Sequence, residues 1–124
     1  MLSKIIVMEV KLTHSYNQLV EIYKKDPNNL VKLLSQSNNA HTLSDGIEIL
    51  SNECDNEDIV LPILKKFLSH IHVLVRESAC NAVSSFYSAS NPPEEIISKI
   101  KCMSESDPSS IVKSLSLDIL SNIK

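Results

Sequence analysis

The chain has very few of the residues on which sheet-rich and turn-rich folds depend. It contains one glycine, Gly46, no tryptophan, and only three tyrosines and two phenylalanines among 124 residues. Glycine supplies the positive φ angles of tight hairpin turns, and aromatic side chains favour strands, so a fold of many short strands is not expected. The abundant leucine, isoleucine, valine and lysine suit helices. The composition therefore predicts an all-α fold.

Basic charge is also scarce, with a single arginine, Arg76, and a formal net charge of -3. Nucleic-acid binding relies on clustered lysine and arginine side chains that neutralise phosphates, so direct binding of nucleic acid is not expected. A glycine-rich phosphate loop cannot be built with one glycine. A basic protein is the partner that an acidic chain accommodates more readily.

Long apolar runs are missing as well. The run at residues 5–8 is too short for the core of a signal peptide, and no stretch approaches the roughly 18 residues of a membrane span. Cys54, Cys80 and Cys102 are odd in number and widely spaced, which fits small buried side chains in a reducing compartment better than a disulfide framework. We therefore expect a cytoplasmic protein that makes no membrane contact.

The chain matches itself at an offset of 37 residues, so that residues 57–86 overlie residues 94–123 without a gap. Apolar positions recur in register with the spacing of helical faces. The recurring positions are Val75, Ala82, Val83 and Phe86 with Val112, Ile119, Leu120 and Ile123, and Ile59, Val60 and Ile63 with Ile96, Ile97 and Ile100. Repetition of this length is typical of arrays of helix pairs, so two helices per repeat are predicted.

Apolar stripes, prolines and capping residues predict seven helices. These helices are expected around residues 15–26, 30–34, 43–53, 59–68, 73–88, 93–106 and 109–123. Residues 1–13 are expected to form a capping helix or an ordered arm, and a helix there would make the count eight. Pro62 is expected near the first turn of its helix, where a missing amide donor is tolerated.

The segment 107–113, Asp-Pro-Ser-Ser-Ile-Val-Lys, resembles the first helix of a HEAT repeat, whose usual pattern is Asp-Pro, then Val-Arg, then small or apolar residues. Residues 74–83 carry the second part of this pattern, with Val75-Arg76, the small Ala79 and the pair Ala82-Val83, although they lack the Asp-Pro. The resemblance covers roughly residues 15–123. It is clearest from residue 57 onward, since the residues before it have no Val-Arg pair.

The resemblance implies a short right-handed α-solenoid of antiparallel helix pairs that occupies residues 1–124 as a single domain. HEAT-like arrays mostly serve as protein-binding scaffolds. Very small acidic arrays are similar in build to bacterial immunity proteins that neutralise a cognate toxin, and this is the function that the resemblance favours. The alternatives are a general adaptor and, more remotely, a HEAT-like DNA glycosylase or bilin lyase.

Few residues could carry chemistry, and each has a structural explanation. His70 and His72 could be two metal ligands, but no further ligands stand at a zinc-site spacing. Cys80 could act as a nucleophile with either histidine, yet it overlies Leu117 in the repeat and is interpreted as a packing position. No catalytic, metal-binding or cofactor-binding residue is therefore assigned, and the chain is not expected to be an enzyme.

Paired carboxylates begin two equivalent helices, Glu57-Asp58 and Glu94-Glu95. The positive end of a helix dipole favours carboxylates, so a role at the helix start explains these pairs better than catalysis does. Together with Asp55 they are also the predicted binding edge for a basic protein, such as a nuclease-type toxin.

Two further assignments follow from the overlay. Arg76 is expected to tie its repeat to the loop of a neighbour, with Asp107 as its partner. The last helix, residues 109–123, is interpreted as the first helix of a repeat that has no second helix, so part of its apolar set is expected to stay exposed. Leu117 lies off the main stripe of that helix and is the predicted contact for a partner or for a homodimer.

Overall fold

Each helix begins at a signal that the sequence contains. The computed structural model describes residues 13–124, and this part of the chain holds seven α-helices and no strand. The helices are α2 (Tyr16–Lys25), α3 (Pro27–Gln36), α4 (Ala40–Glu53), α5 (Glu57–Phe67), α6 (Val73–Phe86), α7 (Glu94–Ser106) and α8 (Ser110–Ser121). Six of them start after a residue whose side chain accepts a hydrogen bond from a backbone amide of the first turn. The all-α prediction is confirmed for these residues.

Two boundaries differ from the prediction because capping residues, and not the apolar stripe, decide where a helix starts. Asp26 caps α3 and Pro27 is its first residue, so α3 begins three residues before its first buried leucine. Asn56 caps α5, which places Pro62 inside the helix as its sixth residue and not in the first turn. The predicted cap or arm at the N-terminus falls almost wholly in residues 1–12, outside the described part of the chain.

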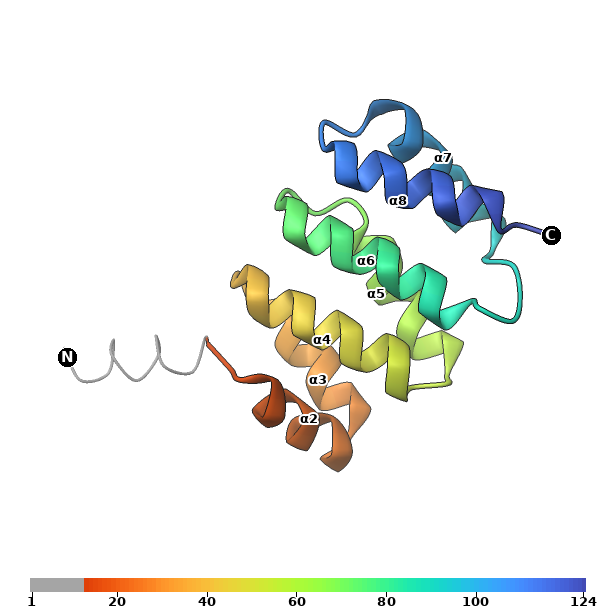
Figure 1. The fold of residues 1–124 in the computed structure, drawn as a ribbon. Helices are drawn as coiled ribbons and strands as arrows, with labels where there is room; N and C mark the ends of the chain where they lie inside the picture. The colour runs from red at the N-terminus through yellow and green to blue at the C-terminus, as the bar shows by residue number, and fades with distance from the viewer. Residues whose placement is uncertain (1–12) are drawn as a thin grey trace.

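Consecutive helices reverse direction and build two rows. Figure 1 shows α4, α6 and α8 side by side in one row, with α3, α5 and α7 behind them. Each back-row helix packs against the front-row helix that follows it, so the chain forms the pairs α3/α4, α5/α6 and α7/α8. Helix α2 packs on α3 and α4 at one end of the rows.

The three front-row helices share a register that extends the repeat to α4. Their N-cap residues are Asn39, His72 and Ser109, which are 33 and then 37 residues apart. With these two offsets, buried positions coincide in all three helices. The coinciding sets are Thr42, Val75 and Val112; Gly46, Ala79 and Ser116; and Ile49, Ala82 and Ile119. A constant offset of 37 cannot find α4, because the loop after α6 has seven residues and the loop after α4 has three.

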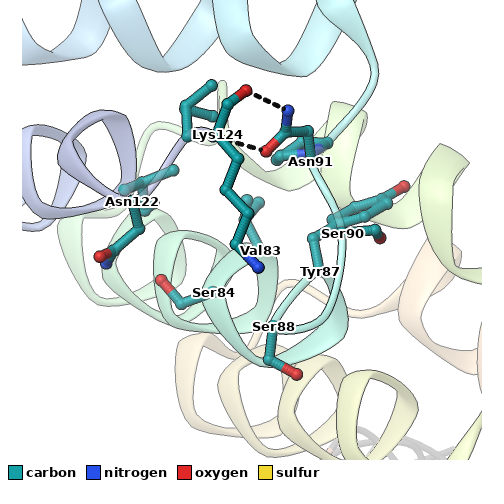
Figure 2. A pocket seen from close by; sticks show the side chains of 11 residues that line it. Val83, Ser84, Tyr87, Ser88, Ser90, Asn91, Asn122 and Lys124 are labelled. Atoms are coloured by element: carbon teal, nitrogen blue, oxygen red, sulfur yellow. Dashed lines mark hydrogen bonds between the residues drawn. The ribbon is translucent and has the colours of Figure 1, made fainter.

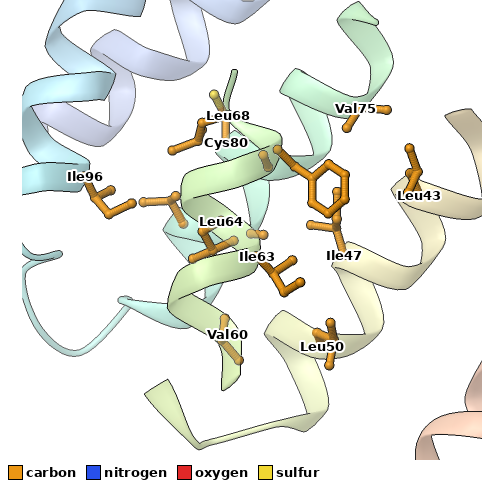
Figure 3. Packing of buried hydrophobic residues seen from close by; sticks show 14 of the residues in the cluster. Leu43, Ile47, Leu50, Val60, Ile63, Leu64, Leu68, Val75, Cys80 and Ile96 are labelled. Atoms are coloured by element: carbon orange, nitrogen blue, oxygen red, sulfur yellow. The ribbon is translucent and has the colours of Figure 1, made fainter. Parts of the chain in front are cut away.

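Apolar side chains from both rows meet in one core. Figure 3 shows Ile63 of α5 directed toward Leu43, Ile47 and Leu50 of α4, with Leu64 on the side of α5 that is nearer Ile96 of α7. Complete burial of a side chain of this size stabilises the fold by about 1.5–3 kcal/mol. The burial of these stripes, more than intrinsic helix propensity, therefore holds the short helices in place.

Gly46 marks the closest approach of α3 and α4. A Cβ atom built at this position would collide with both δ-methyl groups of Leu34, which is 1% exposed. The backbone conformation itself does not require glycine, because no residue described here has a positive φ angle. The absence of a side chain at Gly46 thus allows α4 to pack closely against Leu34 of α3.

The predicted pair of Arg76 and Asp107 joins two successive helix pairs. Nε and Nη2 of Arg76 donate to the two carboxylate oxygens of Asp107 at 2.9 and 3.1 Å. The remaining terminal nitrogen, Nη1, donates to the backbone carbonyls of His70 and Ile71. Burial raises the pKa of Asp107, but hydrogen bonds from Arg76 and from the amide of Ser109 outweigh it and hold this pKa below its usual range.

The interpretation of the last helix as an uncovered first helix is wrong. Helix α8 is the second member of its pair and packs against both α7 and α6. Val112 and Ile119 are buried in these contacts, whereas Ile111 and Leu117 are 58% and 57% exposed. The prediction that part of the apolar set stays exposed, Leu117 in particular, is confirmed.

Candidate functional site

The structure brings the predicted acidic residues to one side of the molecule. Asp55 precedes α5 and Glu57-Asp58 form its first turn, while Glu94-Glu95 form the first turn of α7. The turn before α5 and the loop before α7 both lie at the right of Figure 1, so the two helix starts that carry these residues share an edge of the molecule. We call these five residues the acidic edge.

Two carboxylates of the acidic edge have partners within the chain. The hydroxyl of Tyr87, at the end of α6, donates to Glu57 at 2.7 Å. Lys65 of α5 forms an ion pair with Glu95 at 3.0 Å, with both side chains about half exposed. Because such an exposed pair contributes only about 0–1 kcal/mol, Glu95 remains available to a partner.

The pKa of Tyr87 reflects the negative charge of the acidic edge. Burial, the hydrogen bond to Glu57 and the negative charges of Glu57 and Glu95 all raise the pKa of Tyr87. A phenol is more difficult to ionise in an apolar environment beside carboxylates. The side chains from the starts of α5 and α7 therefore act on one common point, which the sequence overlay alone did not show.

Leu117 does not belong to the acidic edge. It lies in the middle of α8, and its helical neighbours Lys113, Ser114 and Ser121 are exposed polar residues. Its fourth helical neighbour, Leu120, is partly buried against the core, so Leu117 is the one largely exposed apolar side chain among these neighbours. Exposed single apolar residues are common on folded proteins, so the candidate residues divide into a cluster of five and one separate position.

The residues considered for chemistry have structural roles in the fold. Nδ1 of His70 accepts from the amide of His72, and Nδ1 of His72 accepts from the amide of Leu74 as the N-cap of α6. Cys80 is fully buried, which confirms it as a packing position, and burial raises the pKa of its thiol to about 11. Across residues 13–124, no three histidine, cysteine, aspartate or glutamate side chains are grouped in a way that could hold a metal ion.

A pocket of about 290 Å³ lies between the end of α6 and the end of α8. Figure 2 shows that Asn91 closes it on one side, where its side-chain amide donates to the carbonyl of Lys124 and its side-chain oxygen accepts from the amide of Lys124. Both hydrogen bonds are 3.0 Å long. These contacts attach the last described residue to the loop before α7.

A second hollow lies between α4 and α6 and was missed by the sequence reasoning. It has a volume of about 360 Å³, and we call it the α4–α6 groove. Its polar lining consists mainly of Ser44, Glu48 and Asn52 on α4 and Ser78, Asn81 and Ser85 on α6. The hydroxyls of Ser44 and Ser78 are hydrogen bonded to each other, and Ser85 donates to the side-chain oxygen of Asn52 at 2.7 Å.

The signal for this groove is present in the sequence but depends on the register of the helices. Glu48, Asn81 and Asp118 are 33 and 37 residues apart, as the N-caps are, and all three are exposed. With the 37-residue offset alone, Asn81 and Asp118 form an unremarkable polar pair. The third member becomes visible only when α4 is aligned on α6.

No known family, curated protein or solved structure matches this chain in the three comparisons made. None of the helices between residues 13 and 124 combines the length and the apolar character that crossing a bilayer requires.

Proposed function

We propose that this protein is a non-catalytic protein-binding module whose partner presents a basic surface. The observation that supports the proposal is the acidic edge. Its five acidic residues come from two helix starts on the same side of the molecule, and Lys65 pairs with one of them, Glu95. Such a concentration of one sign of charge accelerates capture of an oppositely charged protein and orients it during association.

The same proposal includes the class of helical repeat to which the fold belongs. We assign the chain to short α-solenoids of HEAT-like helix pairs that form a single domain. The common register of α4, α6 and α8 supports this assignment, as does the link from Arg76 to Asp107 between successive pairs. Stacked helix pairs offer extended surfaces to proteins, but the fold by itself does not determine a function.

The most specific form of the proposal is an immunity-type inhibitor of a toxin. A toxin that acts on nucleic acid needs a basic active site, and the acidic edge would occupy that site through charges of the same sign as phosphate. The genetic test is expression of the reading frame next to this gene, alone and together with this chain. Growth arrest by the neighbour that this chain relieves is the expected result, whereas a harmless neighbour would remove the inhibitor from consideration.

The edge itself is tested with charge reversals at two exposed positions, Asp58→Lys and Glu94→Lys. The matched control is Glu21→Lys with Glu105→Lys, which changes the net charge equally on exposed residues of α2 and at the other end of α7. In stopped-flow experiments with the product of the neighbouring reading frame, the association rate constant of the edge variant should be lower by about tenfold or more at low salt. Equal slowing of edge and control variants would reject the acidic edge as the contact surface.

An adaptor that self-associates through α8 is the second candidate, supported by the exposed side chains of Ile111 and Leu117. It predicts a dimer in sedimentation equilibrium that Leu117→Asp dissociates. Ser114→Asp adds the same charge one turn away and serves as the control. A protein that stays monomeric at high concentration would eliminate this candidate and leave the inhibitor untouched.

A further inference from the structure

The α4–α6 groove is a surface that the acidic edge does not include. It is open along the front row of helices, and both walls carry hydroxyl and amide groups. Among the residues that line it, Glu48 carries the only formal charge. Nothing basic lies in the groove itself to compensate this carboxylate.

The surroundings of the groove make it more negative. Helix α4 carries Asp45, Glu48 and Glu53 and contains neither lysine nor arginine. On α6, Glu77 precedes the lining residue Ser78, and the charge of Arg76 is already paired with Asp107. The local field is therefore that of several carboxylates without a nearby free cation on either wall.

The same carboxylates of α4 also act on Tyr16 of α2, a helix that packs on α4 outside the groove. Partial burial raises the pKa of Tyr16 on α2, and the charges of Glu48, Glu53 and Asp45 raise it further. Tyr16 remains 42% exposed. A positive group that enters the groove would meet Glu48 directly, and Asp45 and Glu53 of the same helix would attract it from a greater distance.

The uncharged lining indicates the conformation of the occupant. The hydroxyls of Ser44, Ser78 and Ser85 bond within the lining, whereas the side-chain NH2 groups of Asn52 and Asn81 can still donate to the carbonyls of an extended backbone. A helical occupant has already used its backbone groups internally and would gain little from such a lining. Phosphates and anionic lipid surfaces would be repelled by Glu48 and its neighbours.

We propose that the α4–α6 groove binds an extended segment of a partner protein and places a lysine or arginine side chain of that segment against Glu48. The backbone of the segment hydrogen bonds to the amide groups of Asn52 and Asn81. This inference rests on the protein-binding function proposed above, but it assigns a surface other than the acidic edge.

The experiment is an NMR titration of the ¹⁵N-labelled chain with synthetic peptides. The probes are a short Gly/Ser peptide that carries lysines, the same peptide with glutamine at those positions, and free spermine. The lysine peptide should shift the amides of residues 44–52 and 78–85, and the glutamine peptide should bind much more weakly. Equal binding of the two peptides would overturn the proposal, as would shifts located at the acidic edge.

Two pairs of variants test the residues. Glu48→Gln should weaken binding of the lysine peptide by about fivefold, while Asp118→Asn, the equivalent exposed carboxylate on α8, should change it less than twofold. Asn81→Tyr should block the groove, and Ser114→Tyr on α8 should not. Equal effects of Glu48→Gln and Asp118→Asn would mean that only net charge matters, which rejects the groove.

Other occupants give distinguishable outcomes. If spermine produces the same shifts with the same affinity, the groove binds cations and not a peptide segment. If the peptide-free protein shows concentration-dependent shifts that Asn81→Tyr abolishes, the occupant is a second copy of this chain. Loss of partner binding in the edge variants with full binding by Glu48→Gln and Asn81→Tyr would overturn the groove while leaving the protein-binding function in place.

Discussion

Replacement of Arg76 by alanine should destabilise the fold more than any other single change to a charged residue described here. The side chains of Arg76 and Asp107 are 13% and 5% exposed, and four hydrogen bonds converge on the guanidinium group. Removal of Arg76 leaves the carboxylate of Asp107 buried and short of its main partner. Loss of one member of a buried ion pair costs about 3–5 kcal/mol.

The lower end of this range applies, since Asp107 keeps a hydrogen bond of 2.9 Å from the amide of Ser109. We therefore expect Arg76→Ala to lower the free energy of unfolding by about 3 kcal/mol, which for a domain of this size corresponds to about 12 °C in Tm. Lys113→Ala is the matched control. Lys113 is the counterpart of Arg76 on α8 but is exposed, and its replacement should cost about 0.5 kcal/mol or less.

The pH dependence gives an independent check of the mechanism. The pKa of Asp107 is lowered in the folded protein, so its ionised form stabilises the fold above the unfolded pKa, and this contribution is lost as pH falls through the folded value. In Arg76→Ala, burial without the guanidinium should raise this pKa instead. The stability difference between wild type and variant should then shrink between pH 7 and pH 3.

The assays are urea unfolding followed by circular dichroism at both pH values, together with a double-mutant cycle with Asp107→Ala. We expect a coupling energy of about 2 kcal/mol for the pair. A loss below about 1 kcal/mol for Arg76→Ala would refute the reasoning, because the pair would then behave as a surface ion pair. A stability difference that does not change with pH would refute the role assigned to Asp107.

Three further outcomes are expected. Gly46→Ala should destabilise by about 1 kcal/mol in urea unfolding, because the overlap with Leu34 outweighs the gain in helix propensity, and its cost should vanish in a Leu34→Ala background. Tyr87→Phe should lower the free energy of unfolding by about 1–2 kcal/mol, because the hydrogen bond to Glu57 is lost. The wild-type protein should also lose stability as pH rises above about 10, because the phenol of Tyr87 ionises in the unfolded chain before it does in the folded protein, and Tyr87→Phe should reduce this loss. In native protein a disulfide reagent should label Cys102 quickly and the two buried thiols slowly, whereas three equally fast thiols would contradict the packing of the core.

The helices were largely predictable because their signals are local. Apolar spacing placed the buried face of each helix, and capping side chains such as Asn56 and Ser109 stand in the sequence directly before the helices that they start. The misplacement of Pro62 within its helix shows the limit of this approach. An apolar stripe locates a buried face, but a cap decides the first turn.

The pairing of helices was less predictable because it depends on contacts between residues far apart in the chain. The sequence overlay treated α8 as an uncovered first helix, while in the fold it completes a pair with α7. For the same reason, the overlay at a constant offset did not include α4 in the repeat. A difference of four residues in loop length breaks a constant offset but leaves the stacking of the helices unchanged.

Of the candidate surfaces, the acidic edge was predictable and the α4–α6 groove was not. Glu57 and Glu94 occupy equivalent positions in the overlay, and equivalent turns of a stacked array fall on the same side. The lining of the groove consists of serine and asparagine residues, which are also common in loops and on exposed helix faces. Their significance appears only when α4 and α6 lie side by side.

The sequence by itself determined the class of the fold, the seven described helices and the concentration of acidic residues at two helix starts. These properties follow from spacing, capping and charge within a few turns of chain. The tertiary structure alone decided that Glu57 and Glu95 both act on Tyr87 and that α4 and α6 enclose a polar groove. Such contacts depend on how buried stripes pack against each other, and this packing is settled only when all the helices are in place.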